Sequence, residues 1–147
     1  MSFSLHRFAD QLQHTLANQS IVQLTARTQV AKRWLAAHSE ALIGRTIRQI
    51  TTHGKNLIGW IEGDYYFYSH LMMWGRWMTF EGDAPEIIDR REHARIVTPT
   101  AGAILLSAPV FQLGQGDPYA QVEVLRSLGP DILPKPDEAF DQAQFRD

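Results

Sequence analysis

The pattern of apolar and polar positions divides the chain into a helical start, a long strand-rich middle and a short helical segment. Ser4 is a residue that caps helices well, and apolar residues recur behind it at helical spacing, which predicts a helix over 4–16. The residues of this apolar face are Leu5, Phe8, Leu12 and Leu16. The segment 28–38 fits either a short helix, with Val30, Trp34 and Leu35 on one face, or a long basic loop.

Period-two alternation and β-branched residues predict at least six short strands. They are expected over 21–26, 47–52, 57–61, 65–68, 94–98, 103–107 and 110–113. A Gly63-Asp64 turn joins the clearest hairpin. Polar residues with Gly and Pro predict a loop or a short helical turn over 80–91, and Asp117 or Pro118 begins a helix toward Leu128. We therefore expect an α+β fold, mainly β: an antiparallel β-sandwich with flanking helices.

Composition narrows the class of protein. The 147 residues suffice for one core, and 44% apolar with 20% charged residues is typical of a globular domain. The chain has no cysteine, which excludes disulfides and thiolate zinc sites, and its six histidines show no metal-ligand spacing, so we expect no metal. The N-terminus has no signal-peptide pattern and no segment is apolar enough to span a membrane, which predicts a cytoplasmic location. The net charge of −2 argues mildly against a free-standing nucleic-acid binder.

The run 68–77, "YSHLMMWGRW", has two interpretations. Successive side chains of a strand point to opposite faces, so Leu71, Met72, Met73 and Trp74 cannot all enter one core face. The run is either a strand buried on both sides or a loop with apolar tips, and such tips could fill the gap that a base leaves in a DNA stack.

Polar residues near this run are expected to have ordinary surface roles. Lys55 follows Gly54 where one strand gives way to the next, so it is either a solvated turn lysine or a point charge for a phosphate or carboxylate. His70 is expected to satisfy a backbone group. The acidic residues Asp83, Glu86, Asp89 and Glu92 alternate with Arg90 and Arg91, which predicts a solvated, salt-bridged surface.

Several segments in order resemble the N-terminal domain of the formamidopyrimidine-DNA glycosylase/endonuclease VIII family. They are "GKNLIGWIEGDYYFYSHLMMWGRW", "ARIVTPTAGAILLSAPVFQLG" and "LGPDIL", and the resemblance covers about residues 5–133, closer to the endonuclease VIII branch. It implies a base-excision-repair glycosylase/AP lyase acting on damaged bases in DNA. It also implies that Lys55 contacts a DNA phosphate and that Met72, Met73 and Trp74 enter the duplex with Met73 at the tip. We still assign Leu71 and Trp77 to the core.

The chain departs from the family pattern in three places. Family members open with Met-Pro-Glu, whose proline amine is the nucleophile and whose glutamate is the acid/base; here Ser2 and Phe3 follow Met1. We assign no catalytic residue, and the amine of Met1 or Ser2 is the remaining candidate nucleophile. The family's helical second domain and its zinc finger are also missing, so we expect no cofactor.

These departures leave two functional hypotheses. One is a glycosylase/AP lyase N-terminal domain, over 1–133, whose catalysis is impaired or absent, with 134–147 as a tail or the start of the missing second domain. The alternative is a non-catalytic DNA-binding or protein-binding relative of the family. Damaged or abasic duplex DNA is the expected partner, with a homodimer possible through the surface left by the missing domain. A β-sandwich unrelated to DNA, with 71–74 in its core, is the remaining interpretation.

Overall fold

Two four-stranded antiparallel sheets face each other in the computed structural model, which describes residues 3–38, 40–72, 74–86 and 90–127. One sheet has the strand order β1-β6-β7-β5 and the other has the order β2-β3-β4-β8. The strands are β1 (Gln23–Ala26), β2 (Ile47–His53), β3 (Asn56–Ile61), β4 (Tyr65–His70), β5 (Arg76–Glu81), β6 (Glu92–Val97), β7 (Ala101–Leu106) and β8 (Val110–Gln115). This arrangement confirms the predicted β-sandwich.

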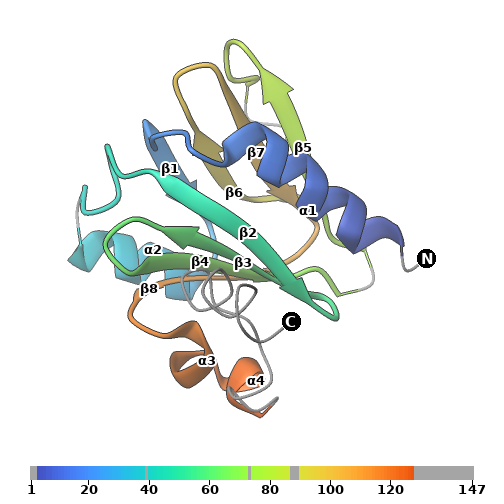
Figure 1. The fold of residues 1–147 in the computed structure, drawn as a ribbon, viewed down its shortest axis with the longest axis vertical. Helices are drawn as coiled ribbons and strands as arrows, with labels where there is room; N and C mark the ends of the chain where they lie inside the picture. Colours follow the sequence, from blue (N-terminus) through green and yellow to red (C-terminus); the bar gives the residue numbers. More distant parts are fainter. Residues whose placement is uncertain (1–2, 39, 73, 87–89, 128–147) are drawn as a thin grey trace, which may run out of the picture.

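Two helices close the open sides of the sandwich. Helix α1 (Phe3–Leu16) packs against β2, β5 and β7, and helix α2 (Gln29–Ala37) packs against β8 and β1 (Figure 1). The backbone N–H of Ile50 donates to Oε1 of Gln13 at 2.8 Å, and that of Asn18 donates to the Ile47 carbonyl at 2.7 Å. Because later helix residues meet earlier strand residues, α1 runs antiparallel to β2, and it begins at the end where β2 finishes.

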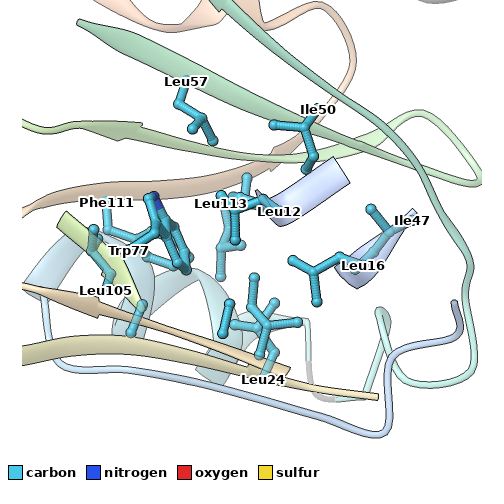
Figure 2. Packing of buried hydrophobic residues seen from close by; sticks show 14 of the residues in the cluster. Leu12, Leu16, Leu24, Ile47, Ile50, Leu57, Trp77, Leu105, Phe111 and Leu113 are labelled. Atoms are coloured by element: carbon cyan, nitrogen blue, oxygen red, sulfur yellow. The ribbon is translucent and has the colours of Figure 1, made fainter. Parts of the chain in front are cut away.

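The core lies between the two sheets and is completed by α1. Figure 2 shows Trp77 of β5 beside Phe111 of β8, and Leu12 of α1 reaching into the same cluster. The Trp77 and Phe111 ring centroids are 6.3 Å apart, and those of Phe67 and Trp77 are 5.7 Å apart. These rings fasten the start of β5 to the opposite sheet, as expected from the core assignment of Trp77.

The sheet that contains β3 and β4 is buried on both faces. Its outer face carries Ile58, Tyr66 and Tyr68, and two short helices cover it: α3 (Pro118–Gln121) and α4 (Glu123–Arg126). The prediction of one helix from Asp117 or Pro118 toward Leu128 is therefore wrong, because the segment forms two short helices. Val122 interrupts it with extended dihedral angles and turns its side chain into this second cluster. Leu128 and residues 134–147 lie outside the described residues.

Other predictions are confirmed with shifted boundaries. The first helix and the hairpin around Gly63-Asp64 form as expected, and both turn residues have positive φ, 88° and 66°. The segment 28–38 takes the helical alternative. The strand over 21–26 begins only at Gln23, because the Ile21 N–H donates to the Arg45 carbonyl in the neighbouring loop.

Two strand boundaries were not anticipated. The predicted loop over 80–91 is wrong at its start, since Phe80 and Glu81 close β5, a strand that the sequence did not indicate. Strand β5 pairs with β7 from Arg76↔Leu106 to Glu81↔Ala101. Strand β6 begins at Glu92, two residues earlier than expected.

Candidate nucleic-acid interface

The run that raised two interpretations is a short loop, residues 71–75, between β4 and β5; we call it the apex loop. Its base is buried, with Leu71 4% exposed and Trp77 just beyond the loop 2% exposed. The Gly75 N–H donates to the Leu71 carbonyl at 2.8 Å, and a Cβ on Gly75 would overlap that carbonyl oxygen. The indole N–H of Trp77 donates to the buried Ser69 hydroxyl at 3.1 Å. The loop is thus firmly anchored at both ends.

The tip of the apex loop is exposed. Met72 is 48% exposed and Trp74 is 79% exposed, the largest exposed fraction given for any bulky apolar side chain in the described chain. Met73 lies outside the described residues, so its expected place at the tip stays a prediction. The interpretation of 71–74 as a strand buried on both sides is wrong, because Met72 and Trp74 are exposed. An exposed apolar tip on an anchored base suits insertion into another molecule.

Two polar side chains reach the backbone of the apex loop. The ammonium of Lys55, in the β2–β3 turn, donates to the Met72 carbonyl at 2.9 Å. The Met72 N–H donates to Nδ1 of His70 at 3.2 Å, so the expectation that His70 satisfies a backbone group is confirmed. The structure therefore brings Lys55 and Met72 together, and Trp74 lies in the same loop.

The apex loop lies at an end of the sandwich that is rich in cationic side chains; we call it the basic end. The strand register places the 53–56 turn, the end of β4 and the start of β8 together there. Arg76 and Arg90 are exposed at this end. Arg76 was not singled out from the sequence, and Arg90 was assigned only to a salt-bridged surface. Arg76 begins β5 and Arg90 lies two residues before β6, so both stand at the same end of the two strands that flank β7. Helix α1 also begins on this side (Figure 1).

Acidic side chains gather at the opposite end of the strands. Glu62 and Asp64 lie in the β3–β4 turn, Glu81 is the last residue of β5, and Asp83 follows it. Arg45, whose guanidinium lies 4.7 Å from the Tyr65 ring centroid, and Arg48 near the start of β2 are at this end too, so charges of both signs are mixed there.

One acidic residue at the basic end differs from its prediction. Glu92 is buried, not part of a solvated surface, and its carboxylate accepts from Nε and Nη2 of Arg95 at 2.8 and 2.9 Å. The same guanidinium donates to the carbonyls of Pro85 and Glu86, so it ties the 82–86 segment to β6. Burial, and then the charge of Arg27, lowers the pKa of His93, so that imidazole adds no charge here at neutral pH.

No cluster of three or more His, Asp or Glu side chains suited to a metal ion occurs in the part of the chain that the structure describes. Within the same residues, no helix is both long enough and apolar enough to cross a bilayer. Met1 and Ser2 lie outside the described residues, so the candidate nucleophile stays a prediction.

Comparison with known proteins decides the family. Residues 4–107 match the model for the formamidopyrimidine-DNA glycosylase N-terminal domain. The chain belongs to this family. The match takes in the β2–β3 turn and the apex loop, and it confirms the resemblance drawn from the sequence motifs.

Individual relatives are similar over most of this chain. Endonuclease 8 of Pectobacterium carotovorum is 28% identical over 130 residues, which cover 88% of this chain and 48% of that protein. The formamidopyrimidine-DNA glycosylase of Lactococcus lactis subsp. cremoris is 33% identical over 111 residues, 72% of this chain and 38% of that protein. The chain spans about half the length of the curated relatives it matches, or less.

Solved structures of the family share the fold. The Lactococcus lactis Fpg in complex with DNA containing an abasic site superposes with a TM-score of 0.67 at 22% identity, over 82% of this chain and 46% of that one. MutM in complex with DNA containing carbocyclic 8-oxo-G gives 0.67 at 21% identity, over 82% and 47%. At these identities the likeness establishes the two-sheet architecture with its flanking helices.

Proposed function

We propose that this chain is a base-excision-repair glycosylase/AP lyase N-terminal domain that binds duplex DNA at a damaged or abasic nucleotide through its basic end. The observation that carries the proposal is the apex loop, in which Met72 and Trp74 are exposed and the Met72 carbonyl accepts from the ammonium of Lys55. The similar proteins are named as endonuclease 8 and as formamidopyrimidine-DNA glycosylase, and the similar structures are complexes with DNA.

The cationic side chains of this surface suit the phosphates of a damaged duplex, and its exposed apolar side chains suit the gap in the base stack. Cationic side chains neutralise phosphates and release counterions, which supplies affinity without sequence preference. Flat or long apolar side chains replace stacking partners where a base has left the helix, and an aromatic–base stack contributes about 1–3 kcal/mol. Trp74 and Met72 have these shapes, while Lys55, Arg76 and Arg90 supply the charge.

We infer further that glycosylase and lyase catalysis is impaired or absent in this chain. Ser2 and Phe3 stand where the family resemblance implies a proline nucleophile and a catalytic glutamate, and phenylalanine cannot transfer a proton. Glu92, a buried carboxylate at the basic end, is engaged in an ion pair with Arg95 and does not offer a substitute acid. On this proposal the chain keeps DNA recognition and lacks effective catalysis.

Fluorescence anisotropy of a labelled duplex tests the binding proposal. Intact duplex and duplex with a tetrahydrofuran abasic analogue are titrated with the chain over a series of salt concentrations. We expect tighter binding to the abasic analogue, and affinity for both duplexes that falls as salt rises. Equal affinity for the two duplexes, or binding that does not respond to salt, would contradict the proposal.

Borohydride trapping on a natural abasic site tests the catalytic inference. We expect preferential binding without a covalent protein–DNA band, which is also the behaviour of a non-catalytic relative. A band would show that a terminal amine still forms the Schiff base and would overturn the inference of impaired chemistry. A homodimer stays a prediction, and sedimentation equilibrium of the free chain would check it.

A further inference from the structure

Two side chains from outside the apex loop form hydrogen bonds with the backbone of Met72. Its carbonyl accepts from Lys55 Nζ at 2.9 Å and its N–H donates to Nδ1 of His70 at 3.2 Å. We propose that Lys55 and His70 are positioning residues that hold the apex loop ready for insertion before DNA arrives. This inference rests on the proposed function, since it concerns how the same loop is prepared for its task.

The conformation of Met72 shows why such support is needed. Its φ is 59°, in the left-handed region that a residue with a Cβ rarely occupies. A residue stays there only when its surroundings impose the conformation. The two hydrogen bonds supply that constraint, because they fix both the N–H and the carbonyl of one residue. Without them, the exposed side chain of Met72 offers little packing to keep the turn in place.

Leu71 and Gly75 are held by other contacts. Leu71 is buried and its N–H donates to the Lys55 carbonyl at 3.3 Å, while the Gly75 N–H closes a turn onto the Leu71 carbonyl. The β2–β3 turn therefore holds the loop through both the backbone and the side chain of Lys55. A tip that is fixed before binding loses less conformational entropy on insertion than a mobile one.

Lys55 also connects the loop to the charge of the DNA backbone. An ammonium group has three N–H donors, so one hydrogen bond to the Met72 carbonyl leaves the group able to donate to a phosphate oxygen as well. Lys55 is exposed, which gives a phosphate access to it. A phosphate bound there would restrict the ammonium and, through it, the loop. Phosphate contact and insertion would then reinforce each other through one side chain.

Labelling with 5-fluorotryptophan tests the positioning role without DNA. The ¹⁹F resonance of Trp74 is assigned by its loss in Trp74→Phe, and those of Trp60 and Trp77 report on the rest of the fold. We expect Lys55→Met and His70→Leu to shift or broaden the Trp74 resonance and to leave the Trp60 and Trp77 resonances in place. Unchanged Trp74 resonances in both variants would overturn the proposal, and a change in only one would overturn it for the other residue.

Two matched variants distinguish the positioning of the apex loop from the general effects of losing a positive charge or of changing the side-chain volume. Lys32→Met removes the same charge from an exposed site on α2 and should leave the Trp74 resonance unchanged. His70→Asn places an amide oxygen close to the position of Nδ1, so it should restore the wild-type Trp74 signal that His70→Leu loses. A Trp74 resonance that moves equally in Lys32→Met, or that His70→Asn fails to restore, would count against the proposal.

DNA binding then separates this inference from the proposed function. The ratio of affinities for abasic and intact duplex should fall about fivefold in Lys55→Met, the factor that one hydrogen bond of ordinary strength supplies, and stay unchanged in Lys32→Met. If wild type shows no preference for the abasic duplex while Trp74 moves in the variants, the proposed function fails and the positioning role stands. If wild type prefers the abasic duplex but the Trp74 resonance does not move in the variants, the proposed function stands and the positioning role fails.

Discussion

Trp74 and Trp77 lie three residues apart, yet the structure predicts opposite consequences for the same substitution. Trp77→Phe removes the indole N–H that satisfies the Ser69 hydroxyl, which is itself fully buried. An unpaired buried hydroxyl costs about 1–3 kcal/mol, and the lost apolar contact adds about 1 kcal/mol. Trp77→Phe should therefore lower the free energy of unfolding by about 2–4 kcal/mol. Trp74→Phe changes a side chain that is 79% exposed and should stay within about 0.5 kcal/mol of wild type.

Urea unfolding followed by far-UV circular dichroism measures both variants without relying on tryptophan fluorescence. With a denaturant slope of about 2 kcal/mol per molar urea, Trp77→Phe should lower the midpoint by about 1–2 M, while Trp74→Phe keeps the wild-type midpoint. Equal losses of stability in the two variants, or a larger loss in Trp74→Phe, would refute the assignment of one residue to the core and the other to the exposed tip.

Three further predictions follow from single contacts. Gly75→Ala should weaken binding to abasic duplex more than to intact duplex in anisotropy titrations, because its Cβ would overlap the Leu71 carbonyl and displace the loop; equal weakening would contradict this. Glu92→Gln should lower the free energy of unfolding in urea by about 3–5 kcal/mol by leaving the Arg95 guanidinium buried without its anion, and a loss below about 1 kcal/mol would indicate that the ion pair is solvated. Burial raises the pKa of Tyr66, Tyr68 and Tyr119 from 10.0 to about 12, and the charge of Asp117 contributes to the increase for Tyr66 and Tyr119. These phenols keep their protons to higher pH in the folded chain than in the unfolded chain, so their contribution to stability is complete below pH 10 and is lost as pH rises toward 12. Absorbance at 295 nm should show that the three phenols ionise only as pH approaches 12. Ionisation of all three near pH 10 would contradict this prediction.

The sequence indicated the regular hairpins well because their signals are local. The β3–β4 hairpin has two apolar strands around Gly63-Asp64, a pair whose positive φ angles match the twist of the strands. The first helix was equally clear, since Leu12 and Leu16 of its apolar face enter the core. In both cases the residues that decide the structure lie within a few positions of one another.

Strand β5 and the role of Glu92 were missed because they depend on distant or irregular features. Residues 76–81 alternate weakly, and their strand conformation is decided by pairing with β7 some 25 residues later in the chain. Glu92 precedes a β-bulge between Glu92 and Ala94, which changes the face on which its side chain lies and lets it meet Arg95. Alternation along the sequence cannot reveal a bulge.

The candidate site was predictable in its residue types but not in its geometry. The run 71–74 could be interpreted as core or as an inserting tip, and only the family resemblance favoured the tip. The structure shows what the run itself could not: Lys55, 17 positions away, donates to the Met72 carbonyl. The cationic residues around the loop are also spread along the chain and meet only through the strand register.

The most direct test of the central claim compares wild type with Trp74→Ala on abasic-analogue and intact duplexes in the same salt. If the exposed tip fills the gap left by a missing base, Trp74→Ala should reduce the preference for the abasic duplex by about fivefold or more, the lower range of one aromatic–base stack. Its affinity for intact duplex should stay close to that of wild type. A preference that survives Trp74→Ala unchanged would contradict the account.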